Sequence, residues 1–387
     1  MSRVLERRRL LLTLMRQVTL EDGSFTIADI AGRLGLPRST VQDWVKRLVA
    51  EGCVAGQRGS HGRHGARFVA ISAMPRSTCR RVFTTIDGDS VTIFHKCLSP
   101  ATAGFCALHH RAAGGVIESL EREGDLLRET GHLGRRPVQV GLSPLAAVGV
   151  EELKLEGDRV IQVLRSIGGP AYSLSEMIAH ADGVLEVRLE RRGALVCAEV
   201  VTRALDHLVI GIDDTDDERG GATFALALAL LQHLARLEGV TPIGHRVVML
   251  EPTIEGRTAG NFSSYLELAV DPADLAMVER HAVRFVSDEA FSGEWGVAIK
   301  RGFRVPDALR AFAGRARTGP VTRGDALDSA SASGISLYGG RGTVGALAAV
   351  GASGSSIEWA NRRSHVGIKV AQRSRKGTRR APMQYAD

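Results

Sequence analysis

"HLVIGIDDTDDERGGATFALALALLQHL", residues 207–234, passes from an apolar run through a cluster of acids to a second apolar run. The run 208–212 indicates a buried strand, and the Ala- and Leu-rich stretch 223–234 indicates a helix. The acids between them are Asp213, Asp214, Asp216, Asp217 and Glu218. They lie where a strand ends and a helix begins, which predicts an α/β unit with a functional turn.

The number of acids in this turn points to a metal. A helix N-terminus attracts anions, and one or two acids are enough to cap it. Several carboxylates would repel a bare phosphate unless Mg²⁺ lies between, since Mg²⁺ binds through one or two carboxylates plus substrate phosphates. We therefore expect a magnesium–nucleotide site with Asp213, Asp214 and Asp216 as metal ligands; an acidic N-cap is the alternative.

A second glycine-rich turn supports nucleotide binding. "GISLYGGRGTVGALAAVGAS", residues 334–353, predicts a strand over 335–338, a turn and an Ala-rich helix, and it contains G-x-G-x-x-G. A dinucleotide-binding unit needs a further strand with an acid about 20 residues on, which the basic and polar residues after 351 do not provide. We expect a phosphate-binding loop instead, with Arg341 available for a charged contact.

Length and cysteine content define the class of protein. The chain has 387 residues, 44% of them hydrophobic, so we expect two or three globular domains. Its five cysteines are few, scattered and odd in number, which is typical of a reducing compartment, and we expect a cytoplasmic protein. No stretch approaches the ~20 apolar residues that a membrane helix needs, so we expect no membrane partner.

The positive charge is concentrated at the two ends of the chain. Residues 1–70 hold 12 Lys and Arg against six Asp and Glu, and residues 361–387 hold eight against one. The chain between these ends has more acids than bases. This pattern favours contact of the ends with a polyanion, beside a mildly acidic body.

The N-terminal region has the pattern of a winged helix-turn-helix. Apolar residues recur at helical spacing over 27–34 and again over 41–48, with Gly35 between, and two short strand-like runs follow. The predicted DNA-binding residues are Arg38, Ser39, Thr40, Gln42 and Lys46 on the second helix, with Arg58 and Arg63 in the wing. The alternative is a winged helix used only for protein contacts, for example in a homodimer.

The region between residues 75 and 200 allows two interpretations. His95, Cys97, Cys106, His109 and His110 are ligand types for zinc or iron, although they lack the tight spacing of usual zinc modules. The alternative is a strand over 91–94 followed by a helix in which Phe105, Cys106 and Leu108 are partly core. Residues 149–190 indicate a strand, a glycine turn, a helix and a strand.

Four motifs together resemble one superfamily. They are "GIDDTD", "GGAT", "EPTIEGRTAGN" and "GGRGTVGALAAVG", which occur in this order within residues 211–351. They look like the ATP-binding domain of the archaeal agmatinylcytidine synthase, which modifies an isoleucine tRNA. They are also similar to the methanogenesis marker protein 11 family, which is the closer resemblance over residues 80–351. The resemblance implies ATP and Mg²⁺ as cofactors.

The resemblance also implies roles for single residues. Asp213, Asp214 and Asp216 would handle Mg²⁺ and phosphate, and Thr223 would join them in phosphoryl chemistry. The residues placed around the nucleotide are Gly220, Gly221, Thr258, Asn261, Gly340, Arg341, Gly342 and Gly345. The synthase continues into an OB-fold and a zinc ribbon that hold tRNA, whereas residues 352–387 follow here, so we do not expect the agmatine–tRNA reaction.

These observations predict a multidomain protein of mixed α/β (α+β) class. The expected parts are a winged helix (1–74), an α+β middle domain (75–203), an α/β ATP-binding domain (204–352) and a basic, disordered tail (353–387). Two functions of different class remain. One is an ATP- and Mg²⁺-dependent enzyme that transfers a phosphoryl or nucleotidyl group to a small molecule or RNA and is fused to a DNA-binding module. The other is a nucleotide-responsive transcriptional regulator without catalysis.

Overall fold

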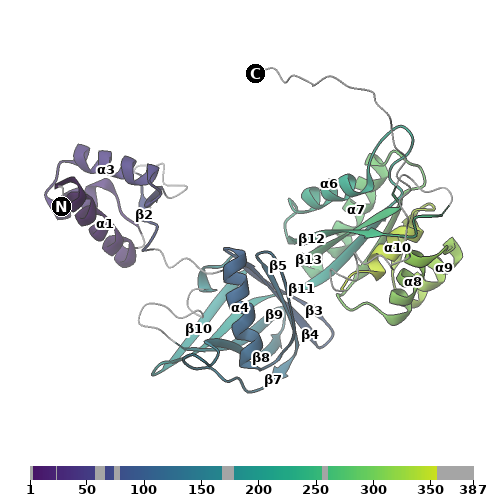
Figure 1. Ribbon diagram of the computed structural model, residues 1–387, viewed down its shortest axis with the longest axis horizontal. Helices are drawn as coiled ribbons and strands as arrows, with labels where there is room; N and C mark the ends of the chain where they lie inside the picture. The colour runs from purple at the N-terminus through teal and green to yellow at the C-terminus, as the bar shows by residue number, and fades with distance from the viewer. Residues whose placement is uncertain are drawn as a thin grey trace, which may run out of the picture. The chain divides into compact units, whose positions relative to one another are not determined.

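The computed structural model describes residues 3–22, 24–56, 66–73, 79–167, 178–254 and 260–354. The chain divides into two compact units, residues 1–205 and 206–387, called here unit 1 and unit 2. The mixed α/β, multidomain class predicted from the sequence is confirmed (Figure 1). The division lies close to the predicted boundary after residue 203, and it keeps residues 1–74 and 75–203 in one unit.

The N-terminal part of unit 1 is a small helical core with a two-stranded sheet. It contains α1 (Arg3–Asp22), α2 (Ile27–Leu34), α3 (Arg38–Ala50), β1 (Val54–Gly56) and β2 (Phe68–Ala70). The apolar residues predicted for α2 and α3 pack with α1, and Ile30, Val41 and Leu48 are fully buried. The helix-turn-helix prediction is therefore confirmed in the described residues.

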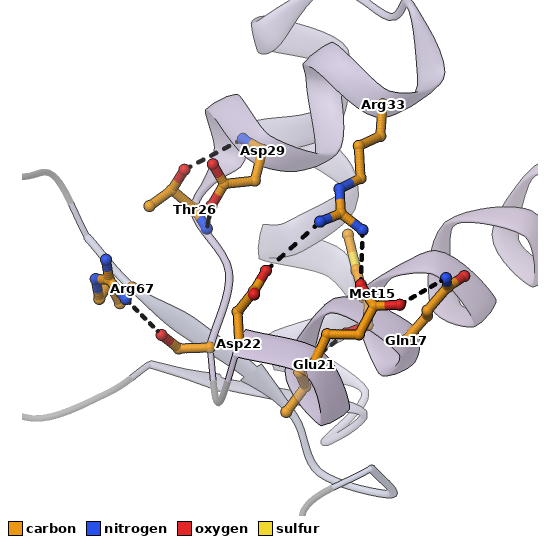
Figure 2. A network of polar contacts seen from close by, with 10 residues as sticks. Met15, Gln17, Glu21, Asp22, Thr26, Asp29, Arg33 and Arg67 are labelled. Atoms are coloured by element: carbon orange, nitrogen blue, oxygen red, sulfur yellow. Dashed lines mark hydrogen bonds and ion pairs between the residues drawn. The ribbon is translucent and has the colours of Figure 1, made fainter.

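Polar contacts fix the start of α2 and its attachment to α1 (Figure 2). Thr26 and Asp29 form a capping box, in which each side chain bonds the other residue's backbone N–H. Arg33 Nη1 donates to Glu21 Oε2 at 3.0 Å, and Arg33 Nη2 lies 3.5 Å from Asp22 Oδ2. These ion pairs tie the last turn of α1 to α2.

The rest of unit 1 is a large antiparallel sheet with one long helix. Its elements are β3 (Cys79–Asp87), β4 (Ser90–Cys97), α4 (Pro100–Ala113), β5 (Ile117–Glu123), β6 (Leu126–His132), β7 (Gly134–Arg135), β8 (Val148–Glu156), β9 (Arg159–Ile167), η1 (Ile178–His180), β10 (Val184–Arg192) and the first half of β11 (Leu195–Asp213). The strand order is β5-β6-β4-β3-β11-β9-β8-β7, and β10 pairs with β11. Figure 1 shows α4 lying against the curved sheet.

Two sequence predictions for this region are wrong in part. Cys106 is buried on α4 as expected, but Phe105 and Leu108 are 46% and 66% exposed because they lie on the solvent side of the helix. Residues 148–167 form the β8–β9 hairpin, since Gly157 adopts a positive φ and turns the chain back. The glycine turn at Gly168 and Gly169 and most of the helix predicted after it lie outside the described residues; the described chain resumes with the short 3-10 turn η1 and β10.

Unit 2 is a five-stranded antiparallel sheet covered on both faces. It contains the second half of β11, α6 (Thr223–Leu234), β12 (Val240–Met249), β13 (Phe262–Val270), η2 (Pro272–Asp274), α7 (Leu275–Glu289), β14 (Gly296–Arg301), α8 (Asp307–Thr318), α9 (Arg323–Ser333), β15 (Ser336–Gly339) and α10 (Thr343–Gly351). The strand order is β12-β13-β11-β14-β15. The helix predicted over 223–234 is confirmed, and the strand predicted over 335–338 begins one residue later.

Alternate residues of β11 supply the two cores of unit 2. Leu208, Ile210 and Ile212 face the core under α6 and α7, whereas Val209 faces the core under α8, α9 and α10 (Figure 1). This alternation is the period of a strand buried on both faces. It explains why the run before the acids is continuously apolar.

Candidate functional site

Three segments that the sequence analysis singled out meet at one edge of the unit 2 sheet. β11, β12 and β15 run in the same direction, because an antiparallel strand separates β11 from each of the other two. Their carboxyl ends lead into the acidic turn (213–222), the loop 250–261 and the glycine loop (339–342). We call this edge the carboxyl edge. Because the segments with the acidic and the glycine-rich motifs meet there, this edge is the candidate site.

Strand register and one ion pair bring the acidic turn and the glycine loop together. Asp213 pairs with Gly296, which in turn pairs with Gly339 on the next strand. The Arg341 guanidinium lies 3.4 Å from Asp214 Oδ2. Two motifs that are more than a hundred residues apart in the sequence therefore form one site.

The backbone is strained at two of the predicted site residues. Asp214 and Asn261 have φ values of 56° and 47°, and they are the non-glycine residues with positive φ in the described parts of the chain. Such conformations persist where the surrounding structure fixes them, often at functional sites. Asn261 Nδ2 donates to the Glu251 carbonyl oxygen at 2.5 Å, which closes the loop. Thr258, predicted beside Asn261, lies outside the described residues.

Asp213 is enclosed by helix α10. A Cβ atom at Gly345 would lie 1.7 Å from Asp213 Oδ2, and one at Gly211 would lie 2.0 Å from the Ala346 carbonyl oxygen. Only glycine at both positions allows α10 to pack directly on the end of β11. Burial raises the pKa of Asp213 well above its ordinary value, and the neighbouring carboxylates raise it further.

Asp214 and Asp216 complete the group of acids at this edge. Burial also raises the pKa of Asp214, although the Arg341 guanidinium opposes this shift. Asp216 Oδ1 accepts a hydrogen bond from Thr223 Oγ1 at 3.1 Å, and Thr215 donates to Thr223 Oγ1 from both its backbone N–H and its hydroxyl. The hydroxyl of Thr223 is thus oriented by Thr215 and directed at a carboxylate.

The remaining two acids of the turn have other roles. Asp217 Oδ2 accepts two hydrogen bonds from the Arg219 guanidinium at 2.6 and 2.9 Å, and this contact lowers the pKa of Asp217. Glu218 is exposed. Gly220 and Gly221 follow with φ values of 145° and 95°, which bring the chain back to the start of α6. The five acids therefore divide into three at the site and two in the turn.

The glycine loop is held by the segment before β14. Gly340 N–H donates to the Trp295 carbonyl oxygen, Gly342 N–H to the Glu294 carbonyl oxygen, and Arg341 N–H to Glu294 Oε2 at 2.8 Å. These amides are bonded within the protein, which leaves the Arg341 side chain as the loop's charged group toward a phosphate. A role of Gly340, Gly342 and Gly345 in nucleotide binding stays a prediction.

Sequence reasoning missed two residues of this site. Thr215 lies inside the acidic motif, and its position between two predicted ligands was a usable signal. Glu294 lies in "SGEWG", residues 292–296, where no pattern distinguishes it from other surface acids. Its role depends on the pairing of β14 with β15, which the sequence alone does not disclose.

The acids at the carboxyl edge suit a metal–phosphate ligand better than a bare ion. In the parts of the chain that the structure describes, no group of three or more His, Cys, Asp and Glu side chains is arranged to hold a metal by itself. Mg²⁺ commonly uses one or two carboxylates and takes its other ligands from phosphates and water. The carboxylates of the carboxyl edge, which Arg341 neutralises only in part, could supply one or two of these Mg²⁺ ligands.

The ligand-type residues of unit 1 form a buried cluster of different composition. His110 Nδ1 lies 2.6 Å from Glu129 Oε1 and His95 Nε2 lies 3.6 Å from Glu129 Oε2, with all three side chains buried. Cys79 Sγ lies 3.6 Å from His95 Nδ1. Cys97 and Cys106 are also buried, and the Cys97 thiol donates to the His95 carbonyl oxygen at 3.8 Å.

The predicted ligand types of unit 1 do not all meet, because only one of the two histidines on α4 joins this cluster. His109 lies apart from this cluster, because its Nδ1 accepts the backbone N–H of Ala147 at 3.0 Å and its ring packs on Phe105. The histidine that joins the cluster is His110, one residue further along α4. One residue is enough to change the face of a helix that a side chain occupies.

The predicted DNA-binding residues lie along α3. Arg38, Ser39, Gln42 and Lys46 are exposed, and Thr40 is half-buried. The opposite face of α3 packs into the core through Val45 and its neighbours. Arg58 and Arg63, predicted for the wing, lie outside the described residues.

Two regions of the chain match known protein families, one in the N-terminal helices and one in unit 2. Residues 2–56 match the Homeodomain-like domain, and residues 209–280 match the TiaS TCKD domain. The chain is similar to the uncharacterized protein MJ0921 of Methanocaldococcus jannaschii, with 28% identity over 264 residues, 66% of this chain and 86% of that protein. It is also 34% identical over 151 residues to TiaS of Pyrobaculum neutrophilum, a 2-agmatinylcytidine synthetase named for an isoleucine tRNA.

The likeness to the synthetases is confined to one part of each protein. The P. neutrophilum match covers 38% of this chain and 35% of the synthetase, so the chain spans about a third of that relative's length. Among solved structures, a complex of TiaS with its tRNA and ATP aligns with 38% of this chain and 36% of that chain, at 30% identity and a TM-score of 0.34. None of the described helices is long and apolar enough to cross a membrane.

Proposed function

We propose that unit 2 binds ATP with Mg²⁺ at the carboxyl edge and transfers a phosphoryl or nucleotidyl group. The observation that carries this proposal is the meeting of the acidic turn and the glycine loop, joined by the Arg341–Asp214 contact. The match of residues 209–280 to the TiaS TCKD domain supports it, since TiaS has been solved with ATP. The acceptor is a small molecule or an RNA.

The residues of the edge have separable roles in this proposal. Asp213, Asp214 and Asp216 would supply one or two carboxylates to Mg²⁺, with its other ligands from phosphate and water, and Mg²⁺ when bound would neutralise charge on the transferring phosphate oxygens. Arg341 would contact phosphate and leave Asp214 when the nucleotide enters. Thr215 orients the Thr223 hydroxyl toward Asp216, so Asp216 is positioned to accept its proton. Gly220, Gly221, Thr258, Asn261 and the glycine loop would line the nucleotide site.

A calorimetric titration tests this site. Asp214→Asn should weaken Mg²⁺–ATP binding by about 10- to 100-fold, because one charge-assisted contact contributes ~1.5–3 kcal/mol. Without Mg²⁺ the wild type and the variant should bind ATP almost equally. Glu218→Gln, an exposed acid of the same turn, is the matched control and should leave both titrations unchanged. Equal affinity of wild type and Asp214→Asn with Mg²⁺ would contradict the proposal.

We further propose that the N-terminal helix-turn-helix binds DNA. The basic excess of residues 1–70 and the exposed polar face of α3 support this, together with the match to the Homeodomain-like domain. In gel-shift titrations Arg38→Ala with Lys46→Ala should weaken duplex binding, and the wild-type affinity should fall steeply with salt. Unchanged binding by the double variant would show that α3 is not the contact surface.

Three finer assignments belong to the same proposal. The order of the four motifs supports membership in the methanogenesis marker protein 11 family. The cysteine pattern supports a cytoplasmic location. A homodimer through the helix-turn-helix is the proposed assembly, and sedimentation equilibrium of the full chain at several concentrations decides it.

The second function, a nucleotide-responsive regulator without catalysis, is favoured by the helix-turn-helix alone. It requires nucleotide binding to change DNA affinity without consumption of ATP. Incubation of the protein with Mg²⁺–ATP and DNA, followed by analysis for ADP, AMP, phosphate and phosphothreonine, distinguishes the two. Any wild-type turnover that Asp214→Asn loses supports the enzyme, and unchanged ATP with altered DNA binding supports the regulator.

A further inference from the structure

A groove lies beside the carboxyl edge, between α7 and the edge strand β15. Its volume is about 730 Å³, and α7 forms one wall while Trp295 and Tyr338 lie across from it. The apolar lining includes Met277 and Val283. This volume lies within the range of pockets that enclose most of a small organic ligand.

The groove and the glycine loop share one segment of chain. The carbonyl oxygen of Trp295 accepts the N–H of Gly340, and the Trp295 ring lies within 3 Å of where a Cβ at Gly339 would be. Gly296, the next residue, pairs with Asp213 of the acidic turn. The groove and the carboxyl edge are therefore joined by residues 294–296.

The lining combines the rings of Trp295 and Tyr338 with polar side chains, among them Glu279, Ser287 and Asp288. Trp295 and Tyr338 are half-buried, so each presents part of its ring to the groove. Glu279 is held by the Tyr338 hydroxyl at 2.5 Å, and its side chain is 18% exposed. A carboxylate has room for about four hydrogen bonds, so Glu279 keeps acceptor capacity for an amino group. Stacking faces and an acceptor for N–H donors are the chemistry that holds a nucleobase.

We infer that this groove binds the purine base of the nucleotide whose phosphates lie at the carboxyl edge. This inference rests on the proposed function and adds the base subsite to it. The base stacks on Trp295, and an amino or imino N–H of the base donates to Glu279. The ribose then bridges from the groove to the phosphates beside Arg341.

Calorimetric titrations with Mg²⁺–ATP and with Mg²⁺–tripolyphosphate, which lacks base and ribose, test the inference. Trp295→Ala should weaken ATP binding on the order of 10- to 100-fold, the usual effect of removing one stacking face, and leave tripolyphosphate binding unchanged. Because Trp295 also packs under the glycine loop, Ser287→Trp is a second variant that fills the groove from an exposed position on α7. It should have the same selective effect.

Glu289→Trp is the matched control, since Glu289 is also exposed on α7 but does not line the groove. It should bind both ligands as the wild type does. ATP binding that Ser287→Trp leaves unchanged, or an equal loss for both ligands in Ser287→Trp, overturns the inference while the phosphate site stands. A wild type that binds neither ligand overturns the proposed function and this subsite with it.

Discussion

Glu129 in unit 1 and Asp213 in unit 2 are both enclosed carboxyl groups, but their surroundings differ in charge. Burial works to raise the pKa of Glu129, yet His110 and His95 outweigh it and hold that pKa far below its ordinary value. Burial raises the pKa of Asp213 and the like charges of Asp214 and Asp216 raise it further, while the backbone N–H of Asp214 and the Arg341 guanidinium oppose the shift only in part. One carboxylate is paired inside the fold, and the other remains in need of a cation.

This difference distinguishes a buried ion-pair cluster from the site that we propose for Mg²⁺–ATP. A buried charge with its partners in place stabilises the arrangement of the elements that carry it, here β4, α4 and β6. A carboxylate kept close to like charges costs stability, and proteins retain such groups where function requires them. We therefore expect a neutral substitution to lower the stability of the protein at Glu129 and to raise it at Asp213.

Glu129→Gln should cause the largest loss of stability, about 3–5 kcal/mol, because it leaves His95 and His110 buried without a counter-charge. Hydrogen exchange of peptides from β4 and β6, measured by mass spectrometry, reads this locally. Glu186→Gln is the matched control, since Glu186 forms an ion pair with Arg188 on the surface, and its peptides should exchange at wild-type rates. Wild-type protection in Glu129→Gln would mean that the buried pairing is not stabilising.

Gly345→Ala should rank second, because its Cβ would overlap Asp213 Oδ2 and displace the Asp213 carboxyl group from its place against α10. Overpacking of this kind costs about 1–3 kcal/mol. Gly314→Ala, also in a helix but with open space around it, should be neutral or slightly stabilising. Thermal unfolding of the two variants compares them directly. A similar melting temperature for both would refute the close packing of α10 on the acids.

Asp213→Asn should stabilise the nucleotide-free protein by about 0.5–2 kcal/mol, since it removes one of three neighbouring negative charges. The expected result is a higher melting temperature and weaker Mg²⁺–ATP binding in the same variant. Asp217→Asn, which loses its contact with Arg219 instead, should not raise the melting temperature. A lower melting temperature for Asp213→Asn would indicate an ordinary helix cap.

The pH dependence of unit 1 should show the smallest effect. Burial works to lower the pKa of His95, but its contact with Glu129 outweighs this and raises it above 6.5. A raised pKa gives stability that is complete below the unfolded value and is lost as pH rises through the folded value. Exchange of β4, corrected for intrinsic rates, should therefore accelerate as the pH rises from about 6 to about 9. Glu129→Gln should flatten this pH dependence. An equal slope in the wild type and the variant would show that the His95–Glu129 contact does not cause it.

Local pattern was enough to predict several elements of this protein. The apolar stripes over 27–34 and 41–48 predicted α2 and α3, and the Ala- and Leu-rich run predicted α6, because helix periodicity depends on residues only three or four apart. It missed the second strand of the β8–β9 hairpin. It also failed at Phe105 and Leu108, whose burial depends on which face of α4 meets the sheet.

The sequence by itself determined which motifs this protein carries, and only the tertiary structure decided which of their residues lie together. Acids at a strand end, a glycine loop and a helix-turn-helix are read from neighbouring residues. The Arg341–Asp214 contact, the role of Glu294 and the groove beside Trp295 depend on strands that pair across long stretches of sequence. The selection of His110 over His109 depends on a single step around α4. Such contacts are set by strand register and helix packing, which no local pattern encodes.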